Sequence, residues 1–284
     1  MTKNKKGILI LTPFFSPNIG GVESHLDNLV TALDEKGYRV FVQTYSPLTT
    51  ENTLSKKLEY LGNSTKIFRH KWIGKNLFHK LENHPVLDFL YLTPYLFFRS
   101  LLFMIANSKK IGTIHAQGLN AGVIGVFLKV IFRKRLLISL HAVYPQLKKN
   151  SLTTLLTNLI LSNAEIVLGM SNAVINQFKK LETKKIEVKR YLYWIDIDRF
   201  KPMNKGDARK ISGIASQFTI LFVGRLIPIK GVTLLIDIAK ELKYAQFIFI
   251  GTGPLDILLK KSSETIPNVN FLGQVRNIDM PAYY

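Results

Sequence analysis

The sequence of 284 residues contains no cysteine. That absence excludes disulfide bonds, thiolate metal sites and a cysteine nucleophile, and it fits a reducing cytoplasmic compartment. Long proline, glycine or serine tracts are missing as well, while hydrophobic residues make up 47% of the chain and charged residues 20%. The composition therefore predicts a folded globular protein, and the length predicts two domains.

Acidic residues are scarce: 39 Lys and Arg oppose 19 Asp and Glu, which gives a formal net charge of +20. Of these, 27 basic and 11 acidic residues lie between Met1 and Arg190. This excess predicts that the first domain faces an anionic partner, either a phosphorylated acceptor or an acidic membrane surface. A lysine-rich solvated surface is the alternative. No nucleic-acid-binding signature accompanies the charge, so no nucleic acid partner is expected.

A long uninterrupted apolar run is also missing. The nearest candidate, Val86–Ala106, is broken by Asp88, Pro94 and Arg99. Because ionised groups are costly inside hydrocarbon, this segment is predicted to be a core or membrane-surface helix rather than a membrane span. We expect a cytoplasmic protein, with peripheral attachment to the inner face of the cell membrane as the role that the basic charge suggests.

Apolar runs alternate with helical patterns along the first two thirds of the chain. A strand-like run at Gly7–Leu11 precedes a Gly-Gly loop, a helical pattern of apolar residues and a second strand-like run at Tyr38–Thr44. The same alternation continues as far as Ile166–Met170. We therefore predict an α/β fold whose first domain, residues 1–190, is a doubly wound, mostly parallel sheet.

A second domain is predicted at residues 218–284, after an interdomain linker at 191–217. Its strands are expected at Phe218–Val223, Phe247–Ile250 and Val269–Leu272. Three parallel strands would leave an apolar edge and uncovered faces, and doubly wound domains usually have five or six strands. The sequence therefore predicts that this second domain is incomplete.

Two glycine-rich turns and one basic loop are candidate phosphate-binding elements. Gly20 and Gly21 precede the first helix, where backbone N–H groups can approach an anion, although a tight turn is the simpler interpretation. Neither this turn nor Gly251-Thr252-Gly253-Pro254 reads as Gly-x-Gly-x-x-Gly, which argues against a nicotinamide or flavin dehydrogenase. Arg225 and Lys230 share one loop between a strand and a helix N-terminus, which suits a diphosphate leaving group without a metal.

Three further positions carry side chains capable of chemistry. His115 and His141 each end a predicted strand, at the sheet edge where open α/β sheets place their sites, and a structural role is the alternative for each. Asp196-Ile197-Asp198 resembles a cation-binding Asp-x-Asp, but its place beside Arg199 favours a cap or an ion pair.

Taken together, these segments resemble the retaining GT-B glycosyltransferases of family four. The matching segments, in the family's order, are Thr12-Pro13 to Gly20-Gly21-Val22-Glu23, His115 with Gly118, Ser139-Leu140-His141, Asp196-Ile197-Asp198-Arg199-Phe200-Lys201-Pro202, Gly224-Arg225-Leu226 with Lys230-Gly231, and Gly251-Thr252-Gly253-Pro254. The resemblance implies two Rossmann-like domains with a donor cleft between them, a nucleotide-sugar donor, and a lipid-linked or cell-surface glycan acceptor. No metal or other cofactor is expected.

The resemblance also implies roles for single residues. Gly20 and Gly21 would reach toward the donor phosphates and the acceptor, with Glu23 and His115 as further donor or acceptor contacts. Arg225 and Lys230 would stabilise the departing diphosphate, Gly251 and Gly253 would bind the nucleotide, and His141 would lie near the scissile bond. In such enzymes the acceptor is thought to attack the face that the diphosphate leaves, so that no protein nucleophile is required.

The sequence departs from the family pattern in three places. Tyr193-Trp194 replaces the common Asn-Gly before the interdomain segment, and Ala142 replaces the Asp that commonly follows the histidine. The family's Glu-x7-Glu segment would follow Tyr284, so this chain is expected to be a weak or inactive fragment. A non-catalytic module that docks on a membrane or glycan, and another GT-B enzyme such as a nucleotide-sugar epimerase, are the alternatives.

Overall fold

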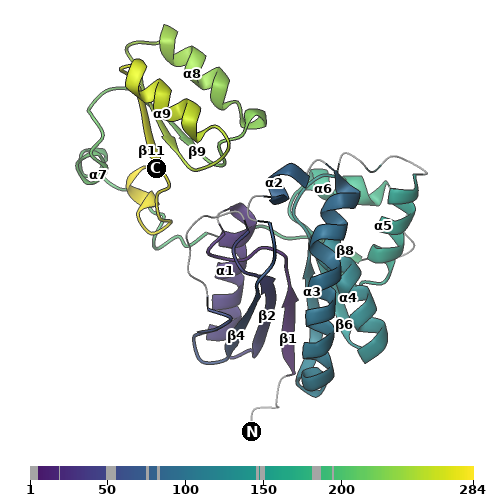
Figure 1. Cartoon of the computed structure of the whole chain (residues 1–284). Helices are drawn as coiled ribbons and strands as arrows, with labels where there is room; N and C mark the ends of the chain where they lie inside the picture. The colour runs from purple at the N-terminus through teal and green to yellow at the C-terminus, as the bar shows by residue number, and fades with distance from the viewer. Residues whose placement is uncertain are drawn as a thin grey trace. The chain divides into compact units, whose positions relative to one another are not determined.

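The computed structural model describes residues 6–18, 20–48, 56–74, 77–81, 84–144, 147, 151–180, 187–193 and 195–284. The chain divides between Trp194 and Ile195 into two compact units, each of which is described by itself (Figure 1). The segment 191–217 therefore contributes two tyrosines to the first unit and helix α7 (Lys205–Ser212) to the second. Both units are α/β, with Rossmann-like, mostly parallel sheets, and this confirms the predicted fold class.

An eight-stranded sheet forms the centre of the first unit, in the order β3-β4-β2-β1-β5-β6-β7-β8. All neighbouring strands are parallel except β3, which runs antiparallel to β4. The strands are β1 (Gly7–Leu11), β2 (Val40–Tyr45), β3 (Leu58–Leu61), β4 (Thr65–His70), β5 (Ile111–Gln117), β6 (Arg135–Leu140), β7 (Ile166–Gly169) and β8 (Glu187–Arg190). Parallel pairing places the carboxyl ends of β1, β5 and β6 at one edge of this sheet, where the predicted histidines lie.

Helices cover both faces of this sheet. Alternate residues of β1 point to opposite faces, so Ile10 packs with Leu26 and Val30 of α1 (Gly21–Glu35), whereas Leu9 and Leu11 belong to the core under α3 (Pro85–Asn107). The remaining helices of this unit are α2 (Leu77–Leu81), η1 (Ser108–Lys110), α4 (Gly118–Phe132), α5 (Leu152–Ser162) and α6 (Asn172–Lys179). Both faces are therefore apolar, which explains why the strands read as continuous hydrophobic runs.

A tyrosine hydroxyl from strand β2 is inserted into the backbone hydrogen bonds of helix α3 and links this helix to the sheet. The buried hydroxyl of Tyr45 donates to the carbonyl oxygen of Leu92 at 2.8 Å and accepts from the N–H of Leu96 at 3.0 Å, two groups that would pair directly in a regular helix. Pro94 lies between them and distorts the same turn. The segment Val86–Lys110 is long and apolar enough to cross a bilayer by composition, yet its inner side packs on the sheet.

Replacing Tyr45 with phenylalanine is expected to lower the free energy of unfolding by about 2 kcal/mol, because both buried helix groups lose their partner. Urea denaturation of the full chain measures this loss. Tyr95→Phe is the matched control, since its ring stacks 6.2 Å from that of Tyr45. Equal stability of Tyr45→Phe and the wild type would show that the helix closes its own ladder once the hydroxyl is gone.

The second unit has a three-stranded parallel sheet in the order β11-β10-β9. Its elements are η2 (Pro228–Lys230), η3 (Met280–Ala282), β9 (Thr219–Val223), β10 (Gln246–Ile250), β11 (Val269–Gly273), α7, α8 (Val232–Glu241) and α9 (Asp256–Thr265). One face packs on α8 and α9, and the other buries Ile248 and Ile250 against Met280 and Phe200. The expectation of uncovered faces was therefore wrong for the central strand, because residues near both ends of this unit cover it.

Candidate active site

Polar and aromatic side chains gather at the carboxyl edge of the first sheet. His115 lies near the end of β5, and His141 directly follows β6, as predicted. Three residues from distant segments join them: His25 of α1, and Tyr191 and Tyr193 after β8. We call these five residues the histidine–tyrosine cluster.

Both ring nitrogens of His141 are hydrogen-bonded within the protein. Its Nε2 lies 2.9 Å from Oε1 of Gln117, and its Nδ1 lies 2.6 Å from the hydroxyl of Tyr193 and 3.2 Å from that of Tyr191. An amide oxygen can only accept, so Nε2 carries the proton and Nδ1 accepts from the tyrosines. The surroundings thus select one neutral tautomer of His141.

His25 and His115 complete the inner side of the cluster. The ring of His25 stacks on that of Tyr193, with centroids 4.3 Å apart and planes inclined by 4°. His25 is buried, and its Nδ1 has no hydrogen-bond partner among the described residues. Nε2 of His115 lies 2.7 Å from the hydroxyl oxygen of Ser139 on the neighbouring strand.

Burial keeps all three histidines neutral. It lowers the pKa of His141 to about 3 and that of His115 to about 4, and the other histidines of the cluster add to both shifts. Burial also lowers the pKa of His25 and raises the pKa of Tyr191 to about 12. A histidine with so low a pKa is a poor general base near neutral pH. The cluster can therefore offer hydrogen bonds and ring surfaces, but not charge.

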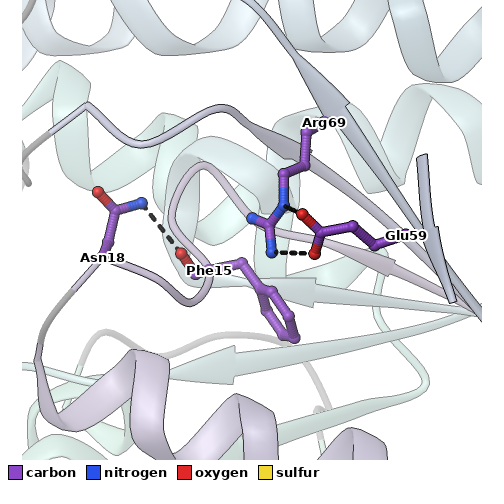
Figure 2. A network of polar contacts seen from close by, with 4 residues as sticks. All are labelled: Phe15, Asn18, Glu59 and Arg69. Carbon is purple, nitrogen blue, oxygen red and sulfur yellow. Dashed lines mark hydrogen bonds and ion pairs between the residues drawn. The ribbon is translucent and has the colours of Figure 1, made fainter. Parts of the chain in front are cut away.

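The loop before α1 is held in place by Asn18 (Figure 2). Its side-chain N–H donates to the carbonyl oxygen of Phe15 at 3.0 Å, and its side-chain oxygen accepts from the N–H of Leu48 at 3.1 Å. Gly20 then caps α1, and a Cβ at Gly20 would meet the carboxylate of Glu23, which lies back across the first helical turn. Glu23 therefore has a local structural position beside the role that the resemblance implied.

An ion pair between buried Arg69 and half-buried Glu59 lies beside this loop, as Figure 2 shows. The guanidinium of Arg69 donates to both carboxylate oxygens of Glu59, at 3.0 and 2.9 Å, and its side chain is only 3% exposed. Its Cζ atom lies 5.6 Å from the centre of the Phe15 ring. Burial raises the pKa of nearby Asp27 to about 6, while a hydrogen bond from Ser16 and the charge of Arg69 partly oppose this.

The basic and glycine-rich loops of the second unit are hydrogen-bonded to each other. Arg225 is half-buried and Lys230 is exposed in the loop between β9 and α8. Leu226, buried between them, donates its N–H to Thr252 O at 2.9 Å. A Cβ at Gly253 would come within 2.5 Å of the carbonyl oxygen of Leu226, so close packing of the two loops explains the glycine at this position.

Asp196 has the structural role that the sequence favoured. Its carboxylate accepts from the N–H groups of Asp198 and Arg199, each at 3.1 Å, and lies 3.5 Å from the guanidinium of Arg199. Within the described part of the chain, no group of three or more potential metal ligands comes together.

Comparison with known proteins identifies the family. A model described as Glycosyltransferase Family 4 matches residues 19–189, which is more than half of the chain. The chain belongs to glycosyltransferase family 4. The two Rossmann-like units are accordingly those of a GT-B fold.

The relatives of this family-4 chain agree with that assignment. The chain is 28% identical to a human phosphatidylinositol N-acetylglucosaminyltransferase polypeptide over 96% of its own length, and it spans only 54% of that protein. It is 24% identical to an uncharacterized glycosyltransferase of Methanocaldococcus jannaschii, covering 94% of this chain and 69% of the relative.

Solved structures share the fold. Sucrose-phosphate synthase from Thermosynechococcus elongatus superposes with a TM-score of 0.74 at 18% identity, covering 99% of this chain and 73% of that one. Anabaena HepE, solved with UDP and glucose, gives a TM-score of 0.67 at 19% identity, covering 98% of this chain and 71% of that one.

The predicted site residues of the family-4 chain fall into two groups. His115 and His141 lie together in the first unit, where a Cβ at Gly21 would come within 4.0 Å of the ring of Tyr193. The second group, formed by the two loops of the other unit, contains Arg225, Lys230, Gly251 and Gly253. His25 was missed, although it neighbours the apolar face of the first helix, and Tyr193 was noted only as a departure from the family pattern.

Proposed function

We propose that this family-4 chain acts as a hexosyltransferase. It would move a sugar from a nucleotide-diphosphate sugar to a lipid-linked or cell-surface glycan acceptor, with retention of configuration. The family match over residues 19–189 carries this proposal. The human relative is named for transfer to phosphatidylinositol, which supports a lipid-linked acceptor, and HepE was solved with UDP and glucose, which supports a nucleotide-sugar donor. The proposed location is the cytoplasm, peripheral on the inner face of the membrane.

The second unit is proposed to bind the donor diphosphate. Arg225 and Lys230 lie on the loop that leads into the N-terminus of α8, so two cations and the positive end of a helix act on one short segment. These charges would stabilise the diphosphate as it leaves, without a metal ion. Gly251 and Gly253 would allow the nucleotide to approach the backbone beside that loop.

The first unit is proposed to contribute Gly20, Gly21 and the histidine–tyrosine cluster to sugar and acceptor binding. Because His141 is neutral and both of its ring nitrogens are bonded to Gln117 and the tyrosines, it can position the tyrosine hydroxyls but cannot remove a proton from a substrate hydroxyl. A retaining reaction in which the acceptor attacks the face that the diphosphate leaves needs no such base. The acceptor proton then passes to an oxygen of the departing phosphate, and the neutral cluster is compatible with that route.

Product analysis tests the reaction type. The chain is incubated with UDP-sugars and a phosphatidylinositol acceptor, and NMR of the product gives the anomeric configuration. A product with the donor's configuration is expected. An inverted product would contradict retention, and conversion of the sugar in the absence of any acceptor would indicate an epimerase instead.

Replacing Arg225 with alanine is expected to weaken UDP binding by about 2 to 3 kcal/mol, the value of a charge-assisted contact to a phosphate. Calorimetric titration with UDP measures the loss. Lys260→Ala is the control, because Lys260 is an exposed cation on α9 of the same unit. Equal affinity of Arg225→Ala and the wild type would remove Arg225 from the donor site.

A further inference from the structure

Helices α3 and α4, which are in contact, each expose three large apolar side chains in their carboxyl-terminal halves. They are Phe98, Leu102 and Ile105 of α3 and Phe127, Val130 and Ile131 of α4, each between 45% and 66% exposed. Helices α3 and α4 lie side by side (Figure 1). The rings of Phe97 and Phe127 lie 5.6 Å apart between them. We call these six residues the α3–α4 apolar face.

The neighbouring helix extends this surface. Helix α5 packs beside α4 and contains no charged residue. Its exposed side chains include Leu152, Leu155, Leu156 and Leu159. Single exposed leucines are ordinary, but ten large apolar side chains on three consecutive helices form a patch of the kind that marks a binding surface.

Positive charge borders this surface. Residues 85–162 contain nine Lys and Arg and a single acidic residue, Asp88, whose carboxylate accepts a hydrogen bond from Asn120 at 2.8 Å. The exposed cations Lys109, Lys110 and Arg133 follow directly after the carboxyl ends of α3 and α4. We call these three residues the cationic rim.

A cavity of about 370 Å³ opens at the same end of α3. Its cationic lining consists of Arg39, Lys66 and Lys110, which join polar Asn and Ser side chains. Its aromatic walls are Phe41, Phe68 and Phe103. Three cations beside aromatic walls suit a phosphate-bearing group that is attached to an apolar body. Basic pockets of this kind can bind lipid head groups.

We propose that the α3–α4 apolar face docks into the interfacial layer of an anionic lipid bilayer, with the cationic rim on the lipid phosphates. The apolar side chains would enter the boundary between head groups and acyl chains, and the rim would supply the electrostatic attraction. The positive charge favours an anionic membrane over a second copy of this chain as the partner of this face, because two copies that met through it would bring two cationic rims together.

Docking leaves α3 on the membrane surface rather than across it. The buried side of the helix includes Leu92, Leu96 and Met104, and the hydroxyl of Tyr45 is bonded inside its ladder. A spanning α3 would have to leave these contacts and expose the sheet beneath. The proposal does not depend on sugar transfer, so its failure would remove the proposed peripheral location but leave the proposed transfer reaction standing.

Co-sedimentation of the full chain with vesicles tests the proposal. We expect binding to phosphatidylcholine vesicles that contain phosphatidylglycerol, weaker binding as salt is raised, and little binding to pure phosphatidylcholine. The rim variant Lys109→Gln/Lys110→Gln/Arg133→Gln should bind the anionic vesicles on the order of a hundredfold more weakly, at about fivefold per cation. The apolar variant Leu102→Gln/Ile105→Gln/Val130→Gln should bind at least about tenfold more weakly.

The control variant is Leu234→Gln/Ile257→Gln, which changes comparably exposed apolar residues of the second unit and should bind as the wild type does. Urea denaturation shows whether each variant is folded. If the apolar variant is unfolded, the rim variant and the salt series test the proposal without it. Equal binding by the rim variant, or equal binding to neutral vesicles, would overturn the proposal. So would a dimer, seen by light scattering, that only the apolar variant disrupts.

Discussion

Replacing Glu59 with alanine is expected to lower the free energy of unfolding by about 3 to 5 kcal/mol, because the substitution leaves a buried guanidinium without its carboxylate. Arg69 is only 3% exposed, and both of its hydrogen bonds in the pair go to Glu59. Its Nη1 already has no partner among the described residues. The substitution therefore removes the carboxylate that accepts both of these hydrogen bonds, and urea denaturation should show the loss directly.

The double variant Glu59→Ala/Arg69→Met separates the ion pair from the packing. Removing both charges together should recover most of the stability, since a buried pair can often be replaced by apolar side chains at little cost. If Glu59→Ala is as stable as the double variant, Arg69 does not depend on this carboxylate. Because the ring of Phe15 lies over Arg69, loss of the pair should also loosen the loop before α1.

The same ion pair shows why part of the fold was not predictable from the sequence. Parallel strands that are buried on both faces were predicted because they read as apolar runs, as in Gly7–Leu11, whereas the exposed and charged β8 was not predicted. The hairpin of β3 and β4 was missed because its strands mix apolar and charged residues. A periodicity that counts arginine as exposed cannot identify Arg69 as an inward-facing residue, since its burial depends on a partner in another strand.

The candidate site was predictable to the extent that it depends on strand ends. His115 lies near the end of β5 and His141 follows β6, and the ends of both strands can be read from the sequence. His25 and Tyr193 come from segments that are far apart in the chain, and nothing local indicates that their rings stack. The protonation states depend on burial by all of these segments together, so they required the structure.

Between pH 7 and pH 5 the free energy of unfolding is expected to fall by about 4 kcal/mol, because three buried histidines cannot take up the protons that the unfolded chain binds. An unfolded histidine binds a proton near pH 6.5. Burial lowers the pKa of His115 to about 4 and that of His141 to about 3. Burial, together with the charge of nearby Arg99, lowers the pKa of His70 to about 4.

The sign follows from which state binds more protons. In this pH window the unfolded chain gains protons on His70, His115 and His141 that the folded chain refuses, so stability falls as the pH falls. Asp27 acts in the opposite direction, because burial raises its pKa to about 6 and the folded chain then binds a proton there before the unfolded chain does. This offsets about 1 kcal/mol of a histidine contribution of about 5 to 6 kcal/mol, which leaves the net fall of about 4 kcal/mol.

Urea denaturation at a series of pH values from 7 to 5 measures this dependence, and a single substitution assigns it. His70 hydrogen-bonds Gln43 and Arg99 away from the cluster, so His70→Gln should reduce the fall between pH 7 and pH 5 by about 2 kcal/mol and leave the cluster's contribution in place. Stability that does not change with pH would mean that the cluster takes up protons while folded. The histidines could then carry charge at the candidate active site, and the case for a neutral His141 would fail.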